Sequence, residues 1–195
     1  MVVHPSVPAR SLAEFIAFAK ANPGMVTMAS GGNGAPSHIS GEMFNMLAGV
    51  QMIHVPYRGA GPALTGVLGG QAQVYFSPLS ATIGYVRQDQ LRVLGVTTET
   101  RAAALADVPA IGELVPGYEA SQLYGLAAPR STPPEIIDKL NKEINAILAD
   151  PSVKARLADL GVTTVGGSAA DFSKAIAGET EKWGKVVKFS GAKVD

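Results

Sequence analysis

Two apolar spacings alternate over the first hundred residues of the chain. Short apolar runs predict strands at 26–29, 52–57, 72–76 and 91–97. Between these runs, apolar residues recur every three or four positions, which predicts helices at 12–21, 36–48, 62–68 and 79–87. A strand–helix unit that repeats at short spacing favours a parallel or mostly parallel sheet with helices on its faces. The first hundred residues therefore indicate an α/β fold.

The pattern changes after Thr98. Residues 99–121 are irregular, and the rest of the chain is expected to be mainly helical. Helices are expected at 134–149, 151–160 and from Ser168 onward, and short strands at 121–128 and 162–165. The stripe that we expect the helix at 134–149 to bury consists of Ile136, Ile137, Leu140, Ile144, Ile147 and Leu148.

A glycine-rich loop follows the first of the predicted βα strands. The loop Ser30–Gly34 has almost no side chains, and Pro36-Ser37-His38 opens the next helix. Glycines let the backbone approach a ligand closely. The N–H groups and the dipole of a helix N-terminus favour an anion at that point. A tight strand-to-helix turn without any ligand explains the same glycines, so both interpretations stay open.

Two further turns, 57–61 and 76–80, also follow predicted strands and are rich in small residues, glycine or proline. Ligands of parallel α/β sheets lie outside the carboxyl ends of the strands, so the three loops indicate one site. There we expect a carboxylate to be held by the Ser30 hydroxyl and by the N–H groups of Gly34 and Ala35. Further contacts are expected from Gly31, His38, Tyr57, Phe76 and Ser77.

Several of these side chains have an alternative role. His38 either donates to a ligand carboxylate or serves as a hydrogen-bonding group at the helix start. Tyr57 either forms an aromatic wall of the site or packs in the core. Arg58 offers a fork for a carboxylate, but a solvated turn residue is favoured. His54 lies between apolar neighbours within a strand, which favours a structural role.

Composition narrows the classes of function. The chain has 195 residues with 16 basic and 16 acidic side chains, so no basic excess indicates nucleic acid. Without cysteine there is no disulfide, thiolate nucleophile or cysteine-based zinc site. The three histidines are scattered and form no metal-binding motif, and we expect no metal or cofactor. No segment has the apolar length of a transmembrane helix, and residues 1–5 lack a signal-peptide pattern.

Besides a protein that only binds a carboxylate, a hydrolytic enzyme is the second hypothesis for the function. Ser30, His38 and an acid such as Glu42 would form its catalytic set. Ser30 does not lie in a Gly-x-Ser-x-Gly elbow, however, and no acid is evidently placed to orient His38. A third hypothesis is an interaction module without a small ligand.

Seven phrases occur in a fixed order along the chain. They are Ala19–Gly24, Ala29–Gly34 followed by His38, His54–Gly59, Leu91–Thr97, Asp107–Pro109, Pro116–Tyr118 and Trp183–Val187. Their order and spacing resemble the solute-binding receptors of tripartite tricarboxylate transporters, also called Bug receptors. The resemblance covers the whole chain.

The resemblance implies a type II periplasmic-binding-protein fold, in which two α/β lobes enclose a cleft. It also implies export to the periplasm and delivery of a small carboxylated solute to a membrane permease. Residues 1–121 would be one complete lobe, and residues 122–195 would supply the crossover strand and helices that complete the other. The family often has an acidic residue where this chain has Ser77, which removes any ligand contact made by that carboxylate.

The chain begins inside the family pattern. A signal peptide and most of the first lobe, with that lobe's own glycine loop, have no counterpart in it. The apolar stripe at 134–149, together with Phe172, Ile176 and Trp183, would then be exposed. Because soluble monomers rarely expose large apolar patches, we expect a homo-oligomer joined through the C-terminal helices, with weak or absent solute binding.

Overall fold

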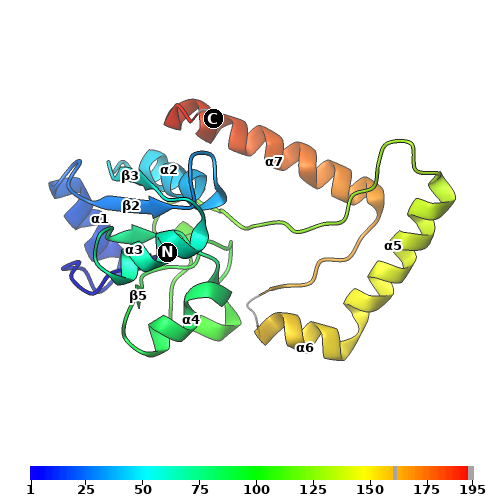
Figure 1. Cartoon of the computed structure of the whole chain (residues 1–195), viewed down its shortest axis with the longest axis horizontal. Coiled ribbons are helices and arrows are strands. Elements are labelled where there is room, and N and C mark those ends of the chain that lie inside the picture. The colour runs from blue at the N-terminus through cyan, green and yellow to red at the C-terminus, as the bar shows by residue number, and fades with distance from the viewer. Residues whose placement is uncertain (160–161, 193–195) are drawn as a thin grey trace. The chain divides into compact units, whose positions relative to one another are not determined.

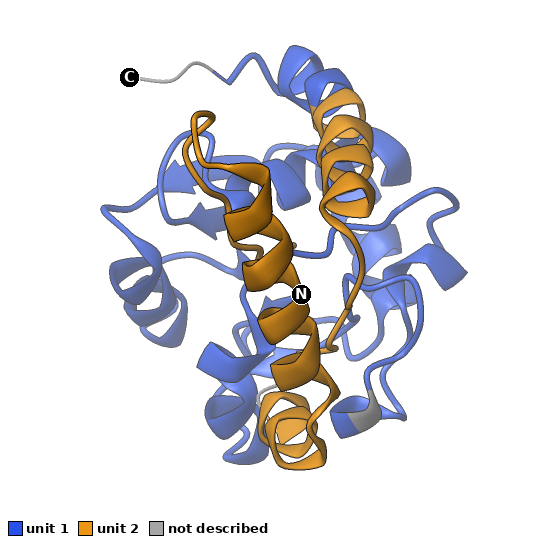
Figure 2. Cartoon of the chain, turned by 90° about the vertical axis from the view of Figure 1, so that its right-hand side faces the viewer, with its two compact units in different colours: residues 1–122, 184–195 blue, residues 123–183 orange. Residues whose placement is uncertain are grey.

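The computed structural model describes residues 1–159 and 162–192. The chain divides into two compact units, which Figure 2 shows in different colours. Unit 1 holds residues 1–122 and the C-terminal residues from 184 onward, and unit 2 holds residues 123–183.

Unit 1 is built on a five-stranded sheet with the strand order β3-β2-β4-β1-β5. The strands are β1 Val2–Val3, β2 Thr27–Ser30, β3 Ile53–Pro56, β4 Val74–Tyr75 and β5 Arg92–Val93. Strand β2 is parallel to both β3 and β4, whereas β1 is antiparallel to β4 and β5. All strands except β1 therefore run in one direction, and the predicted mostly parallel sheet is confirmed.

The helices of unit 1 fall close to their predicted positions (Figure 1). They are α1 Leu12–Ala21, α2 Pro36–Ala48, α3 Ala60–Leu68 and α4 Leu79–Arg87, followed by short 3-10 helices at Ala103–Leu105 and Ile111–Glu113. Helix α3 begins two residues before the predicted Pro62. Gly59, at a φ of 111°, turns the chain from the strand end directly into this helix.

Side chains of β2 alternate between the two faces of the sheet. On one face Met28 lies so close to α2 that a Cβ atom at Gly41 would be 1.8 Å from the Met28 sulfur. On the other face Ala29 belongs to a buried cluster with Ala63 and Val67 of α3. Helices therefore cover both faces, and the carboxyl ends of the strands are left to the loops.

Aromatic side chains fix α2 against the sheet. The Phe44 ring of α2 lies 6.1 Å from the ring of Phe15, 5.7 Å from that of Phe76 and 6.0 Å from that of Tyr118. The buried Tyr118 hydroxyl also donates to the Ser40 carbonyl of α2 over 3.1 Å. Because α2 is held at several points along its length, its first turn has a defined place at the sheet edge.

Unit 2 contains α5 Pro134–Ala149, α6 Pro151–Asp159 and most of α7 Ala169–Ser190. The predicted cap of the last helix is confirmed, because the Asp171 N–H donates to the Ser168 hydroxyl and the Asp171 carboxylate accepts from the Ser168 N–H. The Asn145 side chain of α5 makes two 2.9 Å hydrogen bonds with the Gly167 backbone and so ties the start of α7 to α5. Among the described residues, no helix combines the length and the apolar character needed to span a bilayer.

Two strands predicted for the second half of the chain are wrong. The described residues of 121–128 and 162–165 form no strand, because an apolar run becomes a strand only beside a partner to pair with, and none is present in the part of the chain described. The stripe on α5 is not buried within the chain, in agreement with the exposure expected from the family resemblance: Ile136 is 46%, Leu140 48% and Ile147 56% exposed. The predicted end of α6 at Leu160 lies outside the described residues.

Candidate functional site

The carboxyl ends of β2, β3 and β4 lie at one edge of the sheet, since these strands are parallel neighbours. The loop after β2 touches the turn after β3. The Tyr57 N–H donates to the Ser30 carbonyl over 2.9 Å, and the Gly59 N–H donates to the Gly31 carbonyl over 3.1 Å. A Cβ atom at Gly31 would lie 3.4 Å from the backbone nitrogen of Ala60. The expected convergence of the loops after β2 and β3 is therefore present.

Three helices begin at this edge, α2 at Pro36, α3 at Ala60 and α4 at Leu79. Each directly follows the loop of one of the three strands. Within the described ranges, the N–H groups of Ser37, Ala60 and Gly61 donate to no other group of the chain. Helix starts with open N–H groups carry partial positive charge, which makes this edge suited to an anion.

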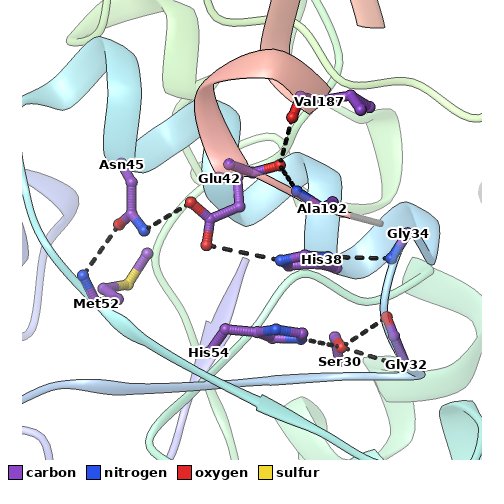
Figure 3. Close-up of polar contacts among 11 residues, drawn as sticks. Ser30, Gly32, Gly34, His38, Glu42, Asn45, Met52, His54, Val187 and Ala192 are labelled. Carbon is purple, nitrogen blue, oxygen red and sulfur yellow. Dashed lines mark hydrogen bonds and ion pairs between the residues drawn. The ribbon is translucent and has the colours of Figure 1, made fainter. Parts of the chain in front are cut away.

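Ser30 is the first residue of the glycine-rich loop, and its side chain bonds to both the loop and β3. Its side chain is fully buried, and its hydroxyl oxygen lies 2.5 Å from His54 Nε2 and 3.1 Å from both the N and the O of Gly32 (Figure 3). The hydroxyl thus links the loop to β3. A direct contact between this hydroxyl and an anion stays a prediction, and it requires one of these bonds to be exchanged.

At the other end of the loop, the backbone of Gly34 is bonded to His38. The Gly34 N–H donates to His38 Nδ1 over 3.1 Å, so this nitrogen carries a lone pair and the ring proton is on Nε2. The Gly31 N–H donates to the Ser37 hydroxyl, and the Ala35 N–H to the Gly32 carbonyl. The N–H groups of Gly34 and Ala35, which we expect to donate to a carboxylate, therefore donate to His38 and to the Gly32 carbonyl in this structure. A bound anion would take the place of these acceptors.

Two histidine rings stack beneath the loop. The His38 and His54 ring centroids are 3.7 Å apart and the planes differ by 9°. Burial lowers the pKa of His38 below its ordinary 6.5. Burial, and after it the charge on His38, lowers the pKa of His54 to about 4. Both rings are therefore neutral at pH 7.

Glu42 approaches the stack from the next turn of α2. Its carboxylate lies 3.8 Å from His38 Nε2, and the Asn45 side chain donates to it over 3.4 Å. Burial raises the pKa of Glu42, and the bond from Asn45 acts in the opposite direction. With His38 neutral at pH 7, this contact joins a ring N–H to a carboxylate rather than two charges.

The remaining predicted residues have different surroundings. The half-buried Tyr57 ring packs on α3, where a Cβ atom at Gly66 would be 2.3 Å from its hydroxyl, which matches the packing alternative. Phe76 is 4% exposed and belongs to the aromatic cluster around Phe44. The Ser77 hydroxyl bonds to the Thr82 hydroxyl at 3.2 Å, at the start of α4.

His54 is the residue whose contacts the sequence did not predict. The structural role expected for it agrees with its bond to Ser30. The signal that could have found this bond is the register Met28↔His54, which places His54 on the same sheet face as Ser30 and α2. The catalytic set of the enzyme hypothesis is found only in part. Glu42 lies 3.8 Å from His38, so an acid is close to this ring after all, but Ser30 bonds to His54 and not to His38. The described residues hold no group of three side chains suited to a metal ion.

Comparison with known proteins matches the family model "Tripartite tricarboxylate transporter family receptor" to residues 1–192. The chain is 33% identical to Protein BugT of Bordetella pertussis over 195 residues. This alignment covers 100% of the chain and 60% of BugT. The chain spans a little over half the length of the first curated relatives that it matches.

Two similar solved structures carry ligands. R. palustris Rpa4515 with adipate is 33% identical, with a TM-score of 0.89 over 98% of this chain and 64% of that one. MatC (Rpa3494) from Rhodopseudomonas palustris with bound malate is 27% identical, with a TM-score of 0.82 over 95% of this chain and 65% of that one. These likenesses confirm the periplasmic-binding-protein-like α/β fold. With residues 1–192 matched, the chain belongs to the tripartite tricarboxylate transporter receptor family, whose members are periplasmic solute-binding receptors and not enzymes.

Proposed function

We propose that this chain is part of an extracytoplasmic receptor that captures a small carboxylate for a tripartite tricarboxylate-type transporter. The observation that carries the proposal is the meeting of three helix starts, those of α2, α3 and α4, at one sheet edge. Helix dipoles and open N–H groups attract an anion without any charged side chain. The adipate and malate in the two solved relatives support a dicarboxylate as the ligand class.

We further propose that the backbone of the loop after β2 makes the central contact. The Gly34 and Ala35 N–H groups would turn from His38 and the Gly32 carbonyl to the carboxylate. A hydrogen bond to a charged acceptor contributes about 1.5–3 kcal/mol against about 1 kcal/mol for a neutral one, so the exchange favours binding. Ser30, Gly31 and His38 would support the loop. Tyr57, Phe76 and Ser77 would complete the site from the two neighbouring strand ends.

Family membership supports proposals for the lobes, the partners and the location of the receptor. We propose that residues 1–121 form one α/β lobe and that residues 122–195 contribute to the other. The partners would be the solute and the membrane permease of the transporter, and the location the periplasm. We also propose that the exposed apolar residues of α5 and α7, such as Leu140 at 48% and Ile176 at 48%, are covered by a second protein surface, in the isolated chain by a second copy.

A thermal-shift series tests the carboxylate proposal. The full chain is heated with malate, with adipate and with adipamide, the uncharged diamide of the same length as adipate. This chain spans a little over half the length of its relatives, so we expect weak binding. At tens of millimolar we expect a rise of the melting temperature with an acid and none with the diamide, because only the acid carries negative charge to the helix starts. Gly34→Val should abolish the rise, since Gly34 has a φ of 72° that a β-branched residue rarely adopts. An equal rise with adipamide would contradict the proposal.

The same samples separate the competing functions. Hydrolysis of the amide bonds of adipamide over hours, followed by one-dimensional NMR, would indicate a hydrolytic enzyme. A stable ligand with a shifted melting temperature supports a receptor. No shift with either acid at tens of millimolar would favour the interaction module.

A further inference from the structure

His38 and His54 each hold one end of the loop after β2. His38 Nδ1 accepts from the Gly34 N–H, and His54 Nε2 bonds to the Ser30 hydroxyl. The two rings lie face to face (Figure 3), and their centroids are 3.7 Å apart. Both ends of the loop therefore depend on the protonation of one stacked pair.

A carboxylate at this loop creates a conflict with neutral His38. If the Gly34 N–H turns to the carboxylate, His38 Nδ1 loses its donor. The lone pair of this ring nitrogen then faces an anion, which repels it. A proton on Nδ1 removes the conflict, because the nitrogen becomes a charged donor directed at the same anion.

The surroundings of the ring are suited to a cation once an anion is bound. The Glu42 carboxylate lies 3.8 Å from His38 Nε2, on the side of the ring away from the loop, and would act as counter-ion. His38 is 4% exposed, so few waters screen this pair. His54 would stay neutral, because two stacked cations repel each other and because burial already lowers its pKa to about 4.

Other titratable groups approach α2 from the neighbouring segments. Tyr118, with a hydroxyl that donates to the Ser40 carbonyl, lies beside Glu119 in the chain. The end of α7 that belongs to unit 1 carries Lys185 and Lys188. Strand β2 has no titratable side chain. Of the two titratable side chains that contact the loop, His38 and His54, His38 is the one that accepts from the N–H that would turn to the ligand.

We propose that capture of a carboxylate at this loop takes up one proton from solvent, and that His38 receives it on Nδ1. His38 then changes from the acceptor of the Gly34 N–H into a donor to the ligand, with Glu42 as its counter-ion. The inference rests on the proposed carboxylate site and adds its proton coupling. By linkage, affinity for a fully ionised carboxylate should rise as pH falls, up to tenfold per pH unit.

Isothermal titration calorimetry measures this coupling directly. The full chain is titrated with adipate and with malate at pH 7.5, where both acids are ionised, in phosphate, HEPES and Tris. These buffers release a proton with different enthalpies. We expect the observed binding enthalpy to vary linearly with the buffer enthalpy, with a slope that approaches one proton taken up per carboxylate site.

Variants assign the proton to a residue. His38→Asn keeps an acceptor near the Nδ1 position and cannot be protonated, so its slope should fall to zero and its affinity should no longer rise at lower pH. His4→Asn is the matched control, because His4 bonds to Ser6 outside the site, and its slope should equal that of the parent. Glu42→Gln should shift the coupling to lower pH, since the His38 cation loses its counter-ion.

The outcomes separate the two proposals. Binding with a slope of zero in the parent chain overturns the proton coupling and leaves the carboxylate site standing. A slope that persists in His38→Asn also overturns the inference, because the proton then goes elsewhere. No heat and no NMR-detected binding with either acid overturns the proposed function, and the coupling with it.

Discussion

The close packing of α2 on β2 holds the first turn of α2 at the sheet edge, and Gly41→Ala perturbs that packing. A Cβ atom at Gly41 would lie 1.8 Å from the Met28 sulfur, 2.7 Å from its Cε and 3.2 Å from Cδ2 of Phe76. Met28 is fully buried, so its side chain has no solvent to move into. Either Met28 leaves its rotamer against a filled core or α2 moves away from the sheet.

Two opposing effects set the magnitude. Alanine in place of glycine inside a helix stabilises by about 1 kcal/mol. Overpacking of a filled core costs about 1–3 kcal/mol. The net change expected for Gly41→Ala is a loss of up to about 2 kcal/mol in the free energy of unfolding. Met28→Ala alone should cost about 2–5 kcal/mol, but it frees the space that the new methyl group needs. The double variant should therefore be more stable than the sum of the single changes by at least about 1 kcal/mol.

Urea denaturation of the four proteins in this cycle measures the effect. Gly84→Ala in α4 is the matched control, because no atom lies within 4 Å of a Cβ at that position. It should stabilise by about 0.5–1 kcal/mol through helix propensity alone. If Gly41→Ala stabilises as much as Gly84→Ala, and the cycle is additive, then α2 does not press on β2 and the loop is not held as described.

Three further predictions concern the stack, the α2 anchor and the exposed stripe. Acid should weaken the fold, because His54 takes up a proton near its ordinary pKa of 6.5 in the unfolded chain but only near a pKa of about 4 in the folded chain. As the pH falls from 6.5 to about 4, the free energy of unfolding should decrease by about 2 kcal/mol after solvent screening. The decrease should be smaller in His54→Gln. Tyr118→Phe should cost about 1 kcal/mol in urea, since the Ser40 carbonyl loses its buried donor; no change would mean that the bond contributes nothing. Light scattering at low micromolar concentration should show a dimer or larger assembly, and Leu140→Glu in the exposed stripe should shift it toward monomer; a monomeric parent chain would contradict the oligomer proposal.

The local structure of unit 1 was predictable because each element carries its own signal. Apolar periodicity marks the helices, Ser11 caps the start of α1, and Gly49 caps the end of α2. The convergence of the loops also followed from sequence, because parallel strands place their carboxyl ends at one edge.

The errors arise where structure depends on a distant partner. Residues 121–128 have strand-like apolar content, but a strand needs a neighbour that local sequence does not reveal. The stripe of α5 has the right period for burial, yet periodicity does not say what covers it. The bond between Ser30 and His54 depends on strand register, which joins residues 24 positions apart.

NMR of the ¹⁵N-labelled full chain can show whether a carboxylate binds where α2, α3 and α4 begin. Adipate is added up to tens of millimolar, with adipamide as the uncharged control. We expect the largest amide shifts on Gly34, Ala35 and Ser37 and smaller ones on Ala60 and Gly61, and we expect adipamide to leave these signals in place. Shifts of equal size with adipamide, or adipate shifts confined to residues outside these helix starts, would contradict carboxylate binding at this edge.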